Sequence, residues 1–341
     1  MLKKRSLITL LGLLLIMAMI FTACGGNNST PVATPSPSPS PTAEATPSPT
    51  PAATPTPEEP APARVRPDTD REGYAISLPD EINTIISIGP SNTEILVALG
   101  LSDRIIAADM FSADVVGIPD RISTELDMMG LDAEYIVNLM PDLVLITGMT
   151  RVGGDDPLAP VSAAGITVIY MPISVSIAAI MEDIRFIAAV MEANEAGEGI
   201  ISTMQGSIDE IGQIAATIAE TRTVYFEVSP APWMFSFGTE TFLNEMIELV
   251  GATNIFAGQV GWIPVTDEVL LEANPDVILT STDFLDDPLG EIMERPGFNV
   301  ITAVQNGDVF QIDANASNRP SHNIVIALRQ IAEAVFPEYF R

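Results

Sequence analysis

Cysteine, histidine and lysine are almost absent from this chain of 341 residues. The one cysteine is Cys24, the one histidine is His322, and the only lysines are Lys3 and Lys4. A single thiol excludes an intramolecular disulfide, and with one imidazole the chain cannot assemble a zinc-thiolate or multi-histidine metal site. These absences exclude the chemistry used to bind bare zinc or manganese.

The scarcity of histidine also argues against an enzyme. His322 would have to be the base of any Ser-His-Asp triad, and no Gly-x-Ser-x-Gly elbow accompanies it. We interpret His322 as a loop or helix-start residue. No catalytic carboxylate pair can be singled out among 45 acidic residues, most of which should be solvated. The sequence offers no nucleophile, base or metal site, and a binding function requires none.

Basic residues are few: 15 stand against 45 acidic ones, which gives a net charge of −30. Loss of the three basic residues at positions 3 to 5 would take the net charge to about −33. Nucleic-acid binding requires a basic footprint, so nucleic acid is excluded as a partner.

Residues 1–23 have the layout of an export signal, because three basic residues precede an uncharged apolar run at 7–21. The run ends in small residues before Cys24 and resembles a bacterial lipobox, although Phe21 stands where leucine is more usual. The resemblance implies cleavage before Cys24 and diacylation of its sulfur, which would anchor the protein in a membrane. The alternative is a transmembrane helix, because residues 6–23 approach the roughly 20 residues that span a bilayer.

Residues 24–70 comprise this cysteine and a segment rich in proline, serine, threonine and alanine. Such a composition cannot bury a core and predicts an extended, polyproline-like linker. At about 3.1 Å per residue, the linker could reach on the order of 100 Å.

The globular part, residues 71–341, alternates short β-branched runs with helical patterns, which predicts an α/β fold. We expect an N-lobe at about 74–175 and a C-lobe at about 221–341. Strands are predicted at residues 84–88, 143–147, 167–171, 224–228, 277–280 and 309–312.

An internal repeat indicates two lobes of similar build. The segments TEILVALG and NEMIELVG place Glu94 and Glu245 six residues before a glycine. In the same order, EYIVNLMPDLVLIT and EVLLEANPDVILTS place Glu134 and Glu268 seven residues before a proline.

Helical patterns occupy the stretch between the two halves. Apolar residues recur at helical spacing from Ile177 to Met191, and a second helix is predicted at about 196–218. We interpret this stretch as a connector whose apolar stripe packs in the core.

The globular part resembles the iron-siderophore and cobalamin binding proteins of ABC importers. The resemblance rests on IISIGPSNTEILVALGLSDRIIAADMF, LDAEYIVNLMPDLVLITG, FGTETFLNEMIELVGATNIF, GWIPVTDEVLLEANPDVILTS and NRPSHNIVIALRQIAEAVFP. It implies two lobes with central parallel sheets, joined by a single long helix, with the ligand in the cleft between them.

The resemblance also implies the function. The protein would be a monomer without a cofactor or catalytic activity, lipid-anchored on the extracytoplasmic face of the membrane. It would capture an iron-siderophore, haem or corrinoid and deliver it to an importer's permease dimer with its ATPase. The rival hypothesis is a sensor or adhesion module that reuses the fold without transport.

Glu134 and Glu268 occupy positions where family members carry one exposed glutamate per lobe. The resemblance implies that these glutamates meet arginines on the two permease subunits. The alternative is that both only favour the dipoles of helices that begin there.

Cleft residues are implied in loops at strand ends. Trp262 is the strongest candidate, because cobalamin binders also have an aromatic residue there and flat aromatic faces suit macrocycles and catechols. A partly buried structural tryptophan is the alternative. The full set is Pro90, Ser91, Asn92, Met110, Phe111, Met128 and Thr147 from the N-lobe and Pro232, Trp233, Trp262, Asn315 and Arg319 from the C-lobe.

Departures from the family pattern leave the ligand class open. Asn315 and the alanine after it stand where cobalamin binders tend to have an Asp-Trp pair. Only Arg151 and Arg319 are placed to hold an anionic siderophore, which disfavours such a ligand. A haem held by the protein would need an axial His, Met or Tyr, for which Met110 and Met128 are the first candidates and His322 the lesser one.

Overall fold

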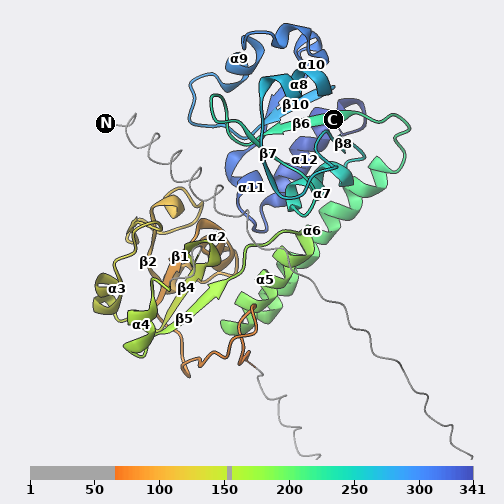
Figure 1. Ribbon diagram of the computed structural model, residues 1–341. Helices are drawn as coiled ribbons and strands as arrows, with labels where there is room; N and C mark the ends of the chain where they lie inside the picture. Colours follow the sequence, from red (N-terminus) through yellow and green to blue (C-terminus); the bar gives the residue numbers. More distant parts are fainter. Residues whose placement is uncertain (1–65, 152–155, 341) are drawn as a thin grey trace, which may run out of the picture.

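The computed structural model describes residues 66–151 and 156–340, which form two lobes joined by helices along one side (Figure 1). The predicted signal, Cys24 and nearly all of the predicted linker lie outside the described residues. Within those two ranges, no helix combines the length and hydropathy needed to cross a membrane.

The N-lobe is built on a five-stranded sheet of order β3-β2-β1-β4-β5, and all its strand pairs are parallel. All of β1 and the first four residues of β4 are buried. Their apolar, β-branched runs are typical of central parallel strands covered by helices on both faces. The strands are β1 (Ile85–Ile88), β2 (Ile105–Asp109), β3 (Ser123–Leu126), β4 (Leu143–Thr147) and β5 (Thr167–Met171).

A glycine turns the chain from β1 into the helix that follows. Gly89 has φ of 106°, which residues with a side chain rarely adopt, and a Cβ there would lie 3.1 Å from the Cβ of Thr147. The turn places the start of this helix at the carboxyl edge of the sheet. The helices of the lobe are α2 (Pro90–Ala98), α3 (Ala133–Leu139) and α4 (Ala159–Ala163), with 3-10 turns η1 (Ser102–Arg104), η2 (Met110–Ser112) and η3 (Gly148–Arg151).

Two packed helices, α5 (Ile177–Val190) and α6 (Asn194–Ala215), connect the lobes. A Cβ on Gly197 of α6 would lie 2.6 Å from the Cβ of Ala188 on α5, so the glycine allows the helices to approach closely. The apolar stripe predicted to pack in the core is buried, which confirms that prediction. The single long connecting helix predicted at about 196–218 is α6, and α5 packs beside it as a second helix of the connector.

The C-lobe contains a four-stranded parallel sheet of order β11-β10-β6-β8 and a separate antiparallel pair, β7 and β9. Its strands are β6 (Thr223–Glu227), β7 (Phe235–Phe237), β8 (Thr253–Asn254), β9 (Trp262–Pro264), β10 (Val277–Thr280) and β11 (Val309–Gln311). Its helices are α7 (Phe242–Leu249), α8 (Asp267–Ala273), α9 (Pro288–Met293), η4 (Phe298–Val300), α10 (Thr302–Asn306), α11 (Ala314–Asn318), α12 (Ile324–Val335) and α13 (Pro337–Phe340).

The six predicted strands all occur, each within one residue of its predicted ends, as β1, β4, β5, β6, β10 and β11. The second repeat is also structural, because α3 and α8 are both seven-residue helices that end in a left-handed residue, Met140 and Asn274. The two lobes are thus built from equivalent segments in equivalent places.

One apolar core runs through both lobes. It extends from Leu96 of α2 through Ile184 of α5 and Ile208 of α6 to Phe226 of β6 and Leu328 of α12. Smaller clusters cover the opposite face of each sheet. The connector is therefore packed into the core and holds the lobes as well as linking them.

Candidate ligand cleft and docking surface

The predicted N-lobe residues lie where parallel strands end, which is where open α/β sheets bind ligands. Pro90 and Ser91 form the first turn of α2, directly after β1. Thr147 is the last residue of β4. Met110 and Phe111 follow β2 in η2, and Met128 follows β3.

Asn92 differs from the other predicted N-lobe contacts because it is buried. Its side-chain amide donates a hydrogen bond to the Ile88 carbonyl at 3.0 Å. Asn92 therefore stabilises the turn between β1 and α2, and its predicted ligand contact remains a prediction.

The predicted aromatic residues of the C-lobe have different surroundings. Pro232 and Trp233 follow β6 and are exposed, and Trp233 is 60% exposed. Trp262 is half-buried in β9, packs against the main core, and meets the Phe237 ring edge-on at 6.3 Å. These contacts favour the structural interpretation of Trp262, while its ligand contact is not tested by the geometry.

Exposed apolar side chains that the sequence interpretation missed also lie just beyond strand ends. Met129 follows β3 and is 50% exposed, and Ile173 follows β5 and is 45% exposed. In the C-lobe, Phe284 follows β10 and is 40% exposed. The sequence did not reveal these residues, because a single apolar residue after a strand forms no periodic pattern.

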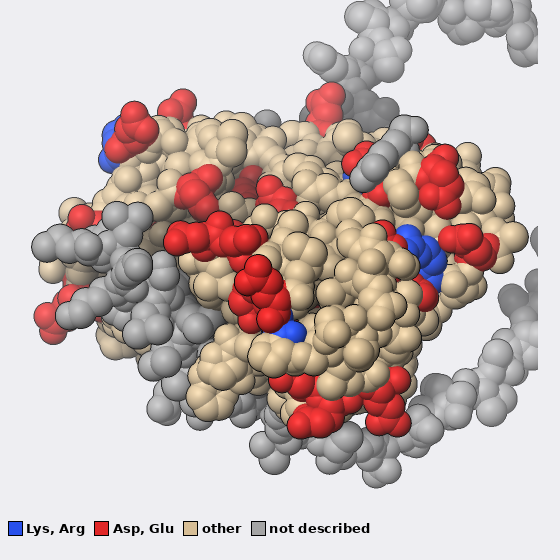
Figure 2. All heavy atoms as spheres, turned by 90° about the horizontal axis from the view of Figure 1, so that it is seen from above, with Lys and Arg blue, Asp and Glu red and all other residues tan. Residues whose placement is uncertain are grey.

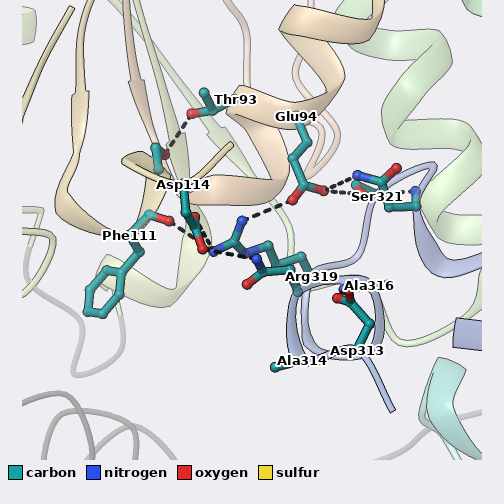
Figure 3. A network of polar contacts seen from close by, with 12 residues as sticks. Thr93, Glu94, Phe111, Asp114, Asp313, Ala314, Ala316, Arg319 and Ser321 are labelled. Carbon is teal, nitrogen blue, oxygen red and sulfur yellow. Dashed lines mark hydrogen bonds and ion pairs between the residues drawn. The ribbon is translucent and has the colours of Figure 1, made fainter. Parts of the chain in front are cut away.

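Arg319 lies at the boundary between the lobes and contacts two carboxylates of the N-lobe (Figure 3). Its Nη1 donates to Glu94 Oε1 at 3.0 Å, and its Nη2 donates to Asp114 Oδ1 at 2.8 Å. Asn315 donates to the other oxygen of Asp114 at 2.9 Å. Two of the C-lobe residues predicted to contact ligand, Asn315 and Arg319, are thus engaged with the N-lobe.

Arg151, the second arginine considered for an anionic ligand, is also engaged. Its guanidinium lies 3.7 Å from Asp156 and 3.8 Å from Glu72, and its centre is 4.1 Å from the Tyr170 ring centroid. Acidic side chains are scattered over the face shown in Figure 2, where basic ones are few. The site therefore offers little free positive charge.

A cavity of about 480 Å³ lies between the lobes beside Arg319. Two carboxyl groups near this cavity have pKa values shifted in opposite directions. Burial raises the pKa of Asp114, but hydrogen bonds from Arg319 and Asn315 outweigh it and lower that pKa. Asp283 lines a neighbouring pocket that shares Asp313 and Asn315 with this cavity; burial raises its pKa, and the charge of Asp114 adds to the effect. The lining includes Glu94, Val97, Asp114, Val116, His322 and Ile326.

His322 lies in the turn just before α12, which confirms its interpretation as a loop or helix-start residue. Burial lowers its pKa, against the opposing effect of the Glu94 carboxylate, so the imidazole is neutral near pH 7. Across residues 66–151 and 156–340, no three His, Cys, Asp or Glu side chains are grouped to hold a metal ion.

Glu134 and Glu268 lie in the first turns of α3 and α8, and both are exposed. Hydrogen bonds from its own backbone amide and from the Thr266 hydroxyl lower the pKa of Glu268. Each lobe therefore presents an exposed glutamate in the first turn of an equivalent helix. This position also suits the helix dipole, so it is compatible with both interpretations of these residues.

Comparison with known proteins identifies the class. The sequence profile of the family described as periplasmic binding protein matches residues 85–316. The chain therefore belongs to this family of solute-binding proteins, and the resemblance and the two-lobed α/β fold predicted from the sequence are confirmed.

Individual relatives are similar over most of the chain. An uncharacterized ABC transporter substrate-binding lipoprotein, YvrC of Bacillus subtilis, is 30% identical over 80% of this chain and 86% of its own length. A cobalamin-binding protein of Halobacterium salinarum is 25% identical over 78% of this chain and 73% of its own. The solved haem-binding protein RhuT of Roseiflexus has the same fold, with 23% identity and a TM-score of 0.67, over 75% of this chain and 99% of its own.

Proposed function

We propose that this protein is the lipid-anchored, extracytoplasmic binding component of an ABC importer, which captures an iron-siderophore, haem or corrinoid and delivers it to the permease. The observation that carries this proposal is the pair of exposed glutamates, Glu134 and Glu268, on equivalent helices of the two lobes. A permease dimer with two-fold symmetry is suited to such a pair. The B. subtilis relative's description as a substrate-binding lipoprotein supports both the importer and an anchor at Cys24.

The proposed ligand surface consists of the loops after the strands. Three exposed apolar side chains, Met110 and Ile173 of the N-lobe and Trp233 of the C-lobe, lie in these loops. Flat or apolar faces of a macrocycle pack favourably on such side chains. Since Arg151 and Arg319 are paired with carboxylates, the surface suits a chelate that is not strongly anionic. The proposed set of ligand contacts also includes Pro90, Ser91, Asn92, Phe111, Met128, Thr147, Trp262 and Asn315.

The docking role is proposed for orientation more than for affinity. Exposed ion pairs each contribute little binding free energy, but complementary charges guide encounter and fix register. One glutamate on each lobe would therefore align the cleft with the pathway through the permease. No catalytic role is proposed for any residue, and turnover of a bound chelate by the purified protein would contradict the binding function.

The first test is a thermal-shift screen of the purified chain against ferric siderophores, haem, cobalamin, cobinamide and free metal ions. A ligand at a hundred times its dissociation constant should add about 2.7 kcal/mol of stability. One chelate should raise the melting temperature, and Trp262→Ala should reduce that shift if the indole contacts the ligand. A folded protein that responds to no chelate would favour a sensor or adhesion module instead.

The second test separates docking from capture. Glu134→Ala/Glu268→Ala should retain ligand binding but lose most chelate uptake in cells that contain the importer. Glu272→Ala changes another exposed glutamate of α8 and is the matched control, expected to transport normally. Normal uptake by the double variant would contradict the docking role.

A further inference from the structure

Glu94 is a buried carboxylate that reaches out of its own lobe. It lies on α2 of the N-lobe and is 5% exposed. Among residues 66–151 and 156–340, its side-chain donors belong to the C-lobe: Arg319 Nη1 at 3.0 Å, Asn323 Nδ2 at 3.0 Å and the Ser321 hydroxyl (Figure 3). A carboxylate with this burial requires such donors, because leaving it unpaired would be costly.

Arg319 extends the same contact to a second N-lobe segment. Besides Glu94 and Asp114, it donates to the backbone carbonyl of Phe111 at 3.1 Å. Its side chain is only 11% exposed. Arg319 thus joins α2 and the segment after β2 to the turn between α11 and α12, independently of the connecting helices.

The repeat-related glutamate provides a natural comparison. Glu245 of α7 accepts a hydrogen bond, 2.7 Å long, from the backbone amide of Ile177 at the start of α5. The side chain of each glutamate therefore contacts a segment outside its own lobe. However, Glu245 meets the connector, whereas Glu94 meets the opposite lobe and pairs with a buried guanidinium.

We propose that Glu94 and Arg319, with Asp114, form an interlobe tie that sets the angle between the two halves of the cleft. Arg319 is then a positioning residue, and its charge holds the lobes instead of a bound anion. This inference about ligand release rests on the proposed binding function, but the tie itself does not. Opening the lobes would expose Glu94 and break its contacts with three C-lobe side chains, so the tie should slow release of a bound chelate.

The distance between the lobes tests the tie without any ligand. Spin labels are attached at Met140→Cys and Val300→Cys, which are 78% and 58% exposed, in the full chain carrying Cys24→Ser. Pulsed electron resonance should give one narrow distance distribution for this parent. Glu94→Gln keeps the side-chain volume but replaces one accepting oxygen with a donor, and it should broaden the distribution toward other distances.

Glu245→Gln is the matched control and should leave the distribution close to that of the parent. If Glu94→Gln fails to fold, Asn323→Ala removes one donor while keeping the ion pair, and it should broaden the distribution less. An unchanged distribution in every folded variant at these positions would overturn the tie.

Release of the chelate found in the thermal screen gives the second readout. Removing one partner of a buried, hydrogen-bonded charge pair acts mainly on dissociation, so Glu94→Gln should release the chelate roughly tenfold faster. A parent that binds no chelate would contradict the proposed function and leave the distance result standing. Equal release rates with a broadened distance would overturn the link to ligand release alone.

Discussion

In the N-lobe, β1 ends in the apolar pair Ile86 and Ile88, whereas the repeat-related strand β6 of the C-lobe carries Tyr225 and Glu227 at the same positions. β1 pairs with β4 in the same register as β6 pairs with β10, and all four side chains are buried. The same place in the fold is thus filled by aliphatic side chains in one lobe and by polar ones in the other.

The polar arrangement depends on Arg295. Its two terminal nitrogens donate to the two oxygens of Glu227 at 2.9 and 3.1 Å, and the Tyr225 hydroxyl donates to Glu227 at 3.1 Å. The side chains of Arg295 and Glu227 are 4% and 1% exposed. Burial raises the pKa of Glu227, while the hydrogen bonds and charge of Arg295 oppose that rise.

One strand position can therefore be filled in two ways that differ in their sensitivity to substitution. An aliphatic pair loses only packing when it is altered. A buried ion pair is replaceable by apolar residues as a whole, but losing one partner leaves an uncompensated charge. The C-lobe should therefore be the lobe more sensitive to single substitutions at this position.

Arg295→Met should produce the largest loss of stability, about 3–5 kcal/mol, because it leaves Glu227 buried without its cation. Urea unfolding at pH 8, where the carboxyl group is harder to protonate, measures the loss. Glu227→Ile/Arg295→Met places the N-lobe residue type in the C-lobe and should recover most of it. Equal stability of the single and double variants would contradict the claim that the loss comes from the unpaired Glu227 carboxylate.

Both lobes share a hydrogen-bonded brace at the start of a central strand. Asp142 Oδ2 accepts hydrogen bonds from the Thr84 amide and hydroxyl at 2.8 and 2.9 Å. Asp276 Oδ2 accepts from the Thr223 amide and hydroxyl at 2.8 and 2.7 Å. Each brace fixes the start of a central strand to the start of its neighbour.

Asp142→Ala and Asp276→Ala should each reduce the free energy of unfolding by about 1–2 kcal/mol, because they remove the acceptor of donors at the start of a buried strand. Asp142→Ala leaves the amides of Asn83 and Thr84 and the Thr84 hydroxyl without this acceptor, and Asp276→Ala leaves the Thr223 amide and hydroxyl without theirs. The two sites share no partners, so the double variant should show the sum of the single losses. Denaturant unfolding of the three variants measures this. A double loss that departs clearly from the sum would contradict the independence of the two braces.

The repeated build of the two lobes was predicted because its pattern is local: the apolar strand runs and the spacing of Glu134 and Glu268 before a proline are readable within a few residues. The two braces were not predicted, because they join residues 58 and 53 positions apart. The tie between Glu94 and Arg319 joins positions 225 residues apart, and no local pattern connects them. For the same reason, Arg319 was predicted at the cleft but its partners were not.

Trp262 illustrates a second limit of the sequence. Its aromatic side chain is equally suited to a ligand surface and to a core. Only its contacts, such as the Phe237 ring, distinguish the two surroundings. Strands β7 and β9, which hold these residues, are three residues each, too short to give a clear period-two pattern.

The lobes should also differ in their response to acid, because the only histidine is His322 of the C-lobe. Burial lowers its pKa from the usual 6.5, so the unfolded chain binds its proton more readily than the folded chain. Stability should therefore fall as the pH decreases below about 6.5, by at most about 1.4 kcal/mol per pH unit.

His322→Gln removes this titration. No other type of side chain has an unperturbed pKa near neutral pH. Urea unfolding of the parent and the variant between pH 7.5 and about 5 should show a shallower decrease for the variant. The carboxylates are common to both proteins, so the difference between the two curves reports His322. Parallel curves would show that the folded imidazole accepts a proton as readily as the unfolded one.

The smallest effect is expected where α3 and α8 end. Met140 has φ of 47° and Asn274 has φ of 45°, in the left-handed region that favours glycine and tolerates asparagine. Met140 is 78% exposed, so Met140→Gly removes strain with little loss of packing and should stabilise the protein by about 0.5–1 kcal/mol. Asn274→Gly should give no such gain, because the Asn274 side chain accepts a hydrogen bond from the Thr302 amide at 2.8 Å. Thermal unfolding of both variants measures the difference, and an equal gain in the two lobes would mean that this hydrogen bond contributes nothing to stability.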